Sequence, residues 1–204
     1  MSALILSSAY LPPVSYFVKL NNSDNIIIDV FEHFIKQSYR NRCYILTASG
    51  RIPLVIPVKK AKAAKICVKD LLIYNDINWQ KIHWRTIETA YNSSPFFLYF
   101  KNEMEVFYKK KIKYLLDFNT ELLNYLLSNL DIKKNIEFSC SYIENSNNSE
   151  DYRFDTNSKK NIDFNFKAYY QVFAEKFEFI PNLSIIDLIF NLGTDAKTYI
   201  HDCI

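Results

Sequence analysis

The residues best suited to chemistry lie in one polar segment, Lys36-Gln37-Ser38-Tyr39-Arg40-Asn41-Arg42, between the apolar runs Ile26–Val30 and Cys43–Leu46. Arginine forks bind carboxylate or phosphate with two hydrogen bonds at once. Strands on both sides of such a segment hold its side chains still. We therefore predict a substrate-binding segment whose contacts come from Lys36, Gln37, Tyr39, Arg40, Asn41 and Arg42. The alternative is a charged loop that solvates the edge of a sheet.

A second group of polar side chains follows Ala3–Ser7, an apolar run of strand length. Pro13 suits the first turn of a helix over the next residues. The branched run Ile26–Val30 is typical of a strand buried on both faces of a parallel sheet. Strand, helix and strand make a βαβ unit, and ligands of such sheets bind beyond the carboxyl ends of the strands. We expect Ser8, Tyr10 and Asp29 at that edge.

His83 is the candidate catalytic base. Asp76 or Asn78 would cap a helix in which Trp79, His83 and Ile87 share one face. A histidine in that position could accept a proton from an attacking amine or hydroxyl. The alternative is a histidine packed in the core.

The remaining pattern predicts an α/β fold, with an N-terminal βαβ-type mixed sheet and a β-hairpin followed by a mainly helical C-terminal half. Cys43–Leu46 and Arg51–Val58 flank a Ser-Gly turn, and Pro53 and Pro57 indicate an edge strand. Further strands are predicted over Ile66–Tyr74 and Ile136–Cys140. Helices are predicted over Phe96–Tyr108, Asp117–Asp131, Phe164–Phe179, Ile185–Asn191 and Asp195–Ile204. We expect a single domain over 1–204, in which 1–75 is mostly sheet-forming, 76–204 is mostly helical and 145–161 is a flexible loop.

Composition excludes several classes of protein. Two glycines, Gly50 and Gly193, leave no room for the glycine-rich loops that cradle phosphates in dinucleotide-binding and P-loop enzymes. A net charge of +3 does not favour a nucleic-acid partner. Two lysine groups, Lys59–Lys65 and Lys109–Lys111, are interpreted as solvated loops, with phosphate steering by the first as the alternative.

The cysteines and the apolar runs indicate the cellular compartment of the protein. Cys43, Cys67, Cys140 and Cys203 form no CxxC pair, so we interpret them as free thiols, with no metal site. The first residues lack the features of a secretory signal, and no apolar stretch is long enough to span a bilayer. A cytoplasmic location is expected.

Three blocks carry a family resemblance: Ser8–Phe17; Tyr39-Arg40-Asn41-Arg42 with Arg51–Val58; and Asn78-Trp79 with His83, Asn92 and Pro95. They are similar, in this order, to the motifs Q-P-x-Y-x-P-x-x-G-Y-F, N-R-N-x-I with T-V-P-V, and N-W-x-x-x-H-x-x-x-I of the WbqC-like family of bacterial proteins. Leu183–Leu188 resembles a block near the family's C-terminus. This chain departs from the opening motif at Ser7-Ser8-Ala9 and has Ser15 in place of glycine.

The resemblance implies a transferase of surface-polysaccharide (O-antigen or lipopolysaccharide) biosynthesis that adds an acyl or aminoacyl group to an amino sugar. It adds Tyr16, Asn78, Trp79 and Asn92 to the substrate-binding residues and makes a nucleotide sugar the candidate small-molecule substrate. In this hypothesis Arg40 and Arg42 clamp a phosphate or carboxylate, the helix after Pro13 meets the phosphates, and His83 is the base. The alternatives are a non-catalytic nucleotide-sugar-binding module and an interaction protein. The sequence identifies neither a cofactor nor an oligomeric state.

Overall fold

The computed structural model describes residues 3–59, 65–144, 149–153 and 164–203, and a parallel sheet organises the first part of the chain. In the described chain this sheet has four strands in the order β5-β2-β1-β6. The strands are β1 (Ala3–Leu6), β2 (Ile26–Ile28), β5 (Ile136–Phe138) and β6 (Ser149–Asp151). Every pairing is parallel, so all four carboxyl ends meet at one edge.

Local sequence explains the first βαβ unit. Pro13 precedes α1 (Val14–Asn21) with a φ of −68°, the value that its ring imposes and that a helix start requires. Residues of α1 and of α4 (Leu115–Asn129) pack against the apolar side chains of β1 and β2. The central strand β1 is therefore buried almost completely, as its uninterrupted apolar run predicts.

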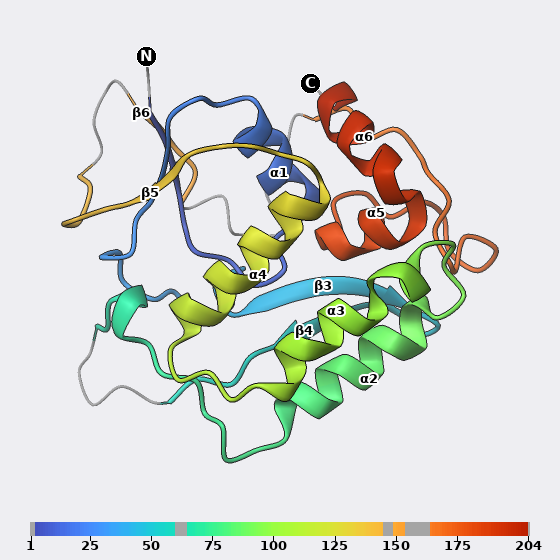
Figure 1. The fold of residues 1–204 in the computed structure, drawn as a ribbon, viewed down its shortest axis with the longest axis horizontal. Helices are drawn as coiled ribbons and strands as arrows, with labels where there is room; N and C mark the ends of the chain where they lie inside the picture. Colours follow the sequence, from blue (N-terminus) through green and yellow to red (C-terminus); the bar gives the residue numbers. More distant parts are fainter. Residues whose placement is uncertain (1–2, 60–64, 145–148, 154–163, 204) are drawn as a thin grey trace.

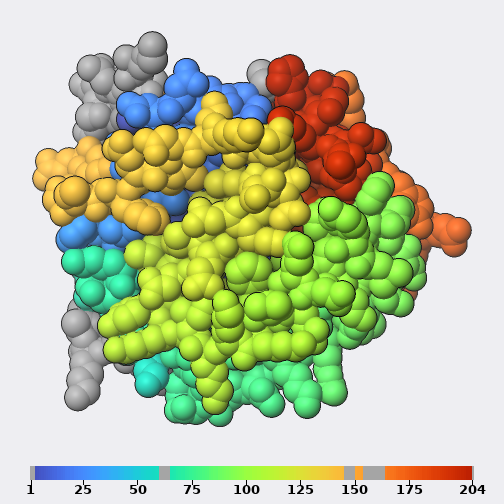
Figure 2. Space-filling model, viewed as in Figure 1, coloured from blue at the N-terminus to red at the C-terminus, as the bar shows by residue number. Residues whose placement is uncertain are grey.

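A β-hairpin forms the second sheet. Strands β3 (Arg42–Thr47) and β4 (Gly50–Val55) pair antiparallel, and Gly50 takes a φ of +99° after the turn. The residue opposite Tyr44 is Pro53, which donates no hydrogen bond, so β4 suits an edge. Helix α2 (Trp79–Tyr91) packs against β3 of this hairpin, and α3 (Phe97–Lys109) packs against α2. Figure 1 shows α4 between α3 and the parallel sheet. Helices α3 and α4 make up much of the surface on this side (Figure 2).

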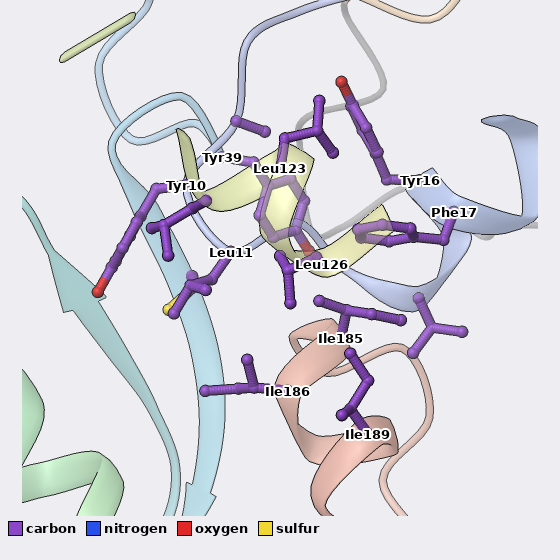
Figure 3. Packing of buried hydrophobic residues seen from close by; sticks show 14 of the residues in the cluster. Tyr10, Leu11, Tyr16, Phe17, Tyr39, Leu123, Leu126, Ile185, Ile186 and Ile189 are labelled. Carbon is purple, nitrogen blue, oxygen red and sulfur yellow. The ribbon is translucent and has the colours of Figure 1, made fainter. Parts of the chain in front are cut away.

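The C-terminal part closes the core. Helices α5 (Ile185–Leu192) and α6 (Ala196–Asp202) follow one another through the short 3-10 helix η2 (Gly193–Asp195). In Figure 3, Ile185, Ile186 and Ile189 of α5 lie near Leu126 of α4. Buried apolar residues from β1 to α6 belong to one connected cluster.

A buried carboxylate ties the irregular segment before α5 to the core. Asp187 accepts hydrogen bonds from the hydroxyls of Tyr91 (3.0 Å) and Tyr169 (2.5 Å) and from Gln171 (3.0 Å). Burial raises the pKa of Asp187, although the three donors act in the opposite direction. Gln171 also bonds the backbone of Ile180 through both ends of its carboxamide.

The predicted α/β class is confirmed, including the parallel sheet, the hairpin and the mainly helical C-terminal half. Three element predictions are wrong. Ile66–Tyr74 is not a strand, because its backbone winds through the 3-10 helix η1 (Val68–Asp70) and bonds to the carbonyls of Val30 and Glu32. Phe164–Phe179 contains no helix, because contacts such as those of Tyr169 and Gln171 outweigh its helical periodicity.

The third error concerns the stretch predicted as a flexible loop at 145–161. Its residues Ser149–Asp151 form strand β6, and the next backbone N–H, of Tyr152, donates to Ile5. The strand is short, polar and at an edge, so it lacks the apolar signal on which a strand prediction depends. The rest of that stretch, apart from 152–153, lies outside the described residues.

We expect Gly193→Ala to destabilise the protein by about 1–3 kcal/mol, because strain and a clash act together. Gly193 has a φ of +57°, and a Cβ there would lie 2.6 Å from the Phe96 ring. Gly50→Ala is the matched control: its φ of +99° is also strained, but the nearest atom would lie at 3.8 Å. Urea denaturation measures both. Equal losses, or no recovery when Phe96→Ala is added to Gly193→Ala, would contradict the clash.

Candidate functional site

Polar and charged side chains gather where the parallel strands end. They come from the loops after the four strands, from the segment before β3 and from α4. Most of them are buried, which is unusual for charged groups. We call this group the carboxyl-edge cluster; its members are Ser7, Ser8, Asp29, Glu32, Arg40, Asn119, Ser139, Asp151 and Arg153.

Arg153 joins three strands at this edge. Its Nη1 donates to Asp29 Oδ2 at 2.5 Å, and its Nη2 donates to Asp151 Oδ2 at 2.6 Å. Its backbone carbonyl accepts from Ser7 Oγ at 3.2 Å and from Arg40 Nη2 at 3.1 Å. The ends of β1, β2 and β6 are therefore linked through one residue, whose side chain is fully buried.

Arg40 forms a second buried ion pair. Its Nε donates to Glu32 Oε1 at 2.9 Å and its Nη2 donates to the other carboxylate oxygen, so the pair is bidentate. The Arg40 side chain is fully buried and that of Glu32 nearly so. In this state the fork of Arg40, which we predicted to bind an anion, holds a carboxylate of the protein itself.

Neutral groups complete the cluster. Asn119 donates from Nδ2 to Ser8 Oγ at 3.1 Å and to the Arg40 carbonyl at 2.9 Å. Its Oδ1 is buried and has no partner among the described residues. The Tyr16 hydroxyl donates to the carbonyl of Ser7 at 3.1 Å. Asp29 accepts from Ser139 Oγ at 2.9 Å and from the backbone of Phe31.

Burial and pairing shift the acidity of these groups in opposite directions. Burial raises the pKa of Glu32, and the Arg40 guanidinium only partly offsets this. Burial also raises the pKa of Tyr16, and the charge of Glu32 adds to the effect. For Asp151, burial acts to raise the pKa, but the hydrogen bonds and charge of Arg153 prevail and lower it. Glu32 is thus closer than Asp151 to taking up a proton.

The topology places this cluster where a ligand is expected. Strand β1 lies between β2 and β6; the chain leaves β1 towards β2, while β6 lies on the other side. Ligands of open parallel sheets bind beyond the carboxyl ends, where connections diverge from neighbouring strands. Ser7 and Arg153 lie at that point.

Of the residues predicted to bind substrate, Ser8, Tyr16 and Arg40 lie in or against the carboxyl-edge cluster. Tyr10, Trp79 and His83 form a separate buried group. The Tyr10 hydroxyl lies 3.0 Å from His83 Nδ1 and 2.9 Å from the Tyr108 hydroxyl, and Trp79 packs edge-on against the His83 ring. Figure 3 shows the hydroxyls of Tyr10 and Tyr16 pointing away from each other.

His83 is placed as a core histidine. It is 5% exposed, and burial lowers its pKa to about 4, despite a hydrogen bond with the backbone of Val55. It is therefore neutral at pH 7. Its role as a base stays a prediction.

The other predicted contacts are spread over the surface and the hairpin. Lys36, Gln37, Asn78 and Asn92 are exposed. Tyr39 and Asn41 are buried, and Asn41 donates to the Ile56 carbonyl at 2.9 Å while its Oδ1 has no described partner. Arg42 donates to the Tyr44 hydroxyl at 3.3 Å, so the forks of Arg40 and Arg42 bind different groups.

The start of α1, predicted to meet phosphates, is already bonded within the chain. The N–H of Val14 donates to the Leu183 carbonyl at 3.0 Å, and that of Ser15 donates to Asn182 Oδ1 at 2.9 Å. A phosphate there would have to displace both acceptors.

Sequence reasoning missed Ser7, Glu32, Asn119, Ser139, Asp151 and Arg153. Asp151 and Arg153 lie in the stretch interpreted as a flexible loop, and Asn119 lies within the helix predicted over Asp117–Asp131. Glu32 had a usable signal, since it lies two residues after the predicted buried strand Ile26–Val30.

Other features bear on the class of protein. All four cysteines are free thiols, as predicted. Among the described residues, no group of three or more His, Cys, Asp or Glu is arranged to hold a metal ion. No helix of the described chain is both long and apolar enough to cross a membrane.

Comparisons with known proteins give one family and one relative. The WbqC-like protein family matches residues 7–159 and 142–199. The uncharacterised protein Rv1507c of Mycobacterium tuberculosis (strain ATCC 25618 / H37Rv) is 26% identical over 227 residues, which cover 98% of this chain and 97% of the relative. No solved structure matches the chain. The first matched segment contains the whole carboxyl-edge cluster and His83.

We expect Arg153→Met to destabilise the protein by about 3–5 kcal/mol, because it leaves the buried Asp29 carboxylate without its cation. Adding Asp29→Asn should recover part of that loss, which urea denaturation at pH 7 would measure as a coupling energy. Lys101→Met is the control: its pair with Glu88 is partly exposed and should cost less than about 1 kcal/mol. Additive losses for Arg153 and Asp29 would contradict the pairing.

We expect His83 to make the protein sensitive to acid. Its pKa is about 4 in the native state and 6.5 in its unperturbed form, so between these values the unfolded state binds a proton that the native state does not. Stability should therefore fall as pH drops from 6.5 to 4, by about 3 kcal/mol in total from this group. The penalty of His83→Gln, measured by denaturation at several pH values, should shrink over the same range. Parallel pH profiles for the two proteins would contradict this.

Proposed function

The chain belongs to the WbqC-like protein family, and we propose that it is a transferase of bacterial surface-polysaccharide biosynthesis. Its substrate would be an anion, such as a nucleotide sugar, bound at the carboxyl-edge cluster. One observation carries the proposal. Two arginines and two carboxylates are withdrawn from water at the carboxyl edge of a parallel sheet, beside the strand from which the connections diverge.

Energetics support a functional interpretation of this cluster. Burying ion pairs costs desolvation energy, and well-packed apolar residues often give a more stable protein. Buried charges with perturbed acidity are also concentrated at binding and catalytic sites. The cluster therefore fits a binding site better than a device for stability.

The chemistry follows from the Arg40–Glu32 pair. A phosphate or carboxylate of the substrate would compete with Glu32 for the planar fork of Arg40. Once displaced, the buried Glu32 carboxylate would lose its cation, and its pKa, already raised, would rise further. Substrate binding would thereby prepare Glu32 to accept a proton.

Acyl or aminoacyl transfer needs such a group. As the amine nitrogen of an amino sugar bonds to the acyl carbon, the bond to the leaving group breaks and the amine proton passes to a base. We propose Glu32 for this role. His83, the base predicted from the sequence, lies in the separate buried group with Tyr10.

Binding without turnover is the second candidate function. It is favoured by the burial of His83, which is neutral, bonded to Tyr10 and packed against Trp79. In this alternative the carboxyl-edge cluster holds a nucleotide sugar and no bond changes.

The test is a thermal-shift series with ATP, UDP- and dTDP-sugars, acetyl-CoA and glycine. A ligand at a hundred times its dissociation constant stabilises the native state by about 2.7 kcal/mol, or roughly 5–10 °C for a chain of this size. We expect a nucleotide sugar to give such a shift. The double variant Arg40→Gln/Glu32→Gln should remove the part of the shift that comes from this cluster, because it replaces the ion pair by an amide pair and removes the charge that binds the anion.

Lys101→Gln/Glu88→Gln is the matched control, because it removes a surface ion pair. Like Arg40→Gln/Glu32→Gln, it takes away one positive and one negative charge and leaves the net charge unchanged. It should keep the full shift. If no nucleotide sugar or other anion shifts the melting temperature, or if both double variants respond like the wild type, the proposal is wrong. A shift without product formation in any donor–acceptor mixture would favour the binding module.

A further inference from the structure

Two lysine groups that lie far apart in the sequence meet in the fold. Lys59 belongs to the first group and Lys111 to the second, and Lys113 follows the second group two residues later. A cavity of about 170 Å³ is lined by these three side chains together with Leu72, Ile73, Asn75 and Asp76. This is well above the roughly 10–15 Å³ that one water needs, so a small oxyanion fits.

Hydrogen bonds between segments fix the walls of this cavity. Lys59 N donates to the Leu72 carbonyl at 2.9 Å, and Ile73 N donates to the Lys113 carbonyl at 3.0 Å. Asn75 Nδ2 donates to the carbonyl of Ile112 at 2.8 Å. The backbone at Lys59, at Lys113 and at Ile112, next to Lys111, is therefore held in place before any ligand binds.

The charge around the cavity is unbalanced. Three lysines face one acidic residue, Asp76. Within the described chain, the ammonium groups of Lys59 and Lys111 form no ion pair; Lys113 lies 5.0 Å from the centre of the Tyr114 ring. Three cations at one small cavity repel each other, and an anion bound among them would relieve that repulsion.

We propose that this cavity binds a phosphoryl oxyanion, through Lys59, Lys111 and Lys113. Each ammonium group offers three donors, and phosphate oxygens accept such charge-assisted bonds strongly. The phosphate could belong to a soluble ligand or to a lipid head group, because both present the same oxygens.

The site is separate from the carboxyl-edge cluster. The two share no residue, and the cavity lies between the hairpin's exit at Lys59 and the turn before α4. The proposal therefore does not depend on the proposed transferase function, and each can fail alone.

The experiment is isothermal titration calorimetry of the full chain with inorganic diphosphate at low ionic strength, where exposed charges are screened least. We expect Lys111→Gln/Lys113→Gln to weaken binding by about tenfold or more, because two charge-assisted contacts are lost. Lys133→Gln/Lys197→Gln is the matched control: it removes the same charge from exposed lysines that pair with Asp131 elsewhere on the molecule. It should change the affinity by less than about twofold.

Two further arms separate the possible ligands. The titration is repeated in the Arg40→Gln/Glu32→Gln background, which removes the other proposed anion site. Diphosphate binding that remains in this background and is weakened by Lys111→Gln/Lys113→Gln is assigned to the lysine cavity. Sedimentation with vesicles of phosphatidylcholine and phosphatidylglycerol tests a head-group source. Binding to those vesicles in place of diphosphate, lost in Lys111→Gln/Lys113→Gln, would support the same cavity with a lipid phosphate.

Several results would overturn the proposal. One is equal affinity of the lysine-cavity variant and the charge-matched control for both probes. Another is the loss of diphosphate binding in Arg40→Gln/Glu32→Gln alone. Failure of the wild type to bind either probe at low ionic strength would also refute it. Circular dichroism of each variant confirms that the compared chains are folded.

Discussion

The buried pair between Arg153 and Asp29 is the interaction on which the carboxyl edge depends. The two residues follow β6 and β2, which are not neighbours, and their contact spans the end of β1. Because neither side chain reaches water, each charge relies on the other and on nearby hydrogen bonds. The backbone carbonyl of Arg153 accepts hydrogen bonds from Ser7 and Arg40. The Arg153–Asp29 pair therefore also positions the second ion pair, between Arg40 and Glu32.

Two buried polar groups with different characters therefore lie on either side of the loop after β1. The carboxyl-edge cluster is charged, and burial raises the pKa of its Glu32. The group around Tyr10 and His83 is neutral, aromatic and closed by hydrogen bonds. Tyr10 connects the two, because its backbone N–H donates to the Tyr39 carbonyl, next to Arg40, while its hydroxyl contacts His83. A change at one group would reach the other through a few residues.

The sequence predicts the elements that carry strong apolar patterns: β1, α1, β2, the hairpin and the helices α2 to α5. It also predicts Ser8 and Asp29 at the carboxyl edge, because a predicted strand also gives the position of its carboxyl end. It does not predict Arg153, since a three-residue polar strand at a sheet edge has no periodicity to detect. It also does not reveal that Arg40 turns inward to Glu32 while Arg42 turns to Tyr44, because that choice depends on tertiary partners.

The position of β6 has a consequence for how the chain acquires its structure during synthesis. Strand β6 leaves the ribosome about 146 residues after β1, its neighbour in the sheet. Until then Asp29 and Arg40 lack the arginine and the carbonyl that they contact in the native state. At translation speeds of roughly 5–20 residues per second, the nascent chain spends seconds with these charges hydrated. Final closure of the sheet is therefore a late, long-range step, which is typical of slow folding.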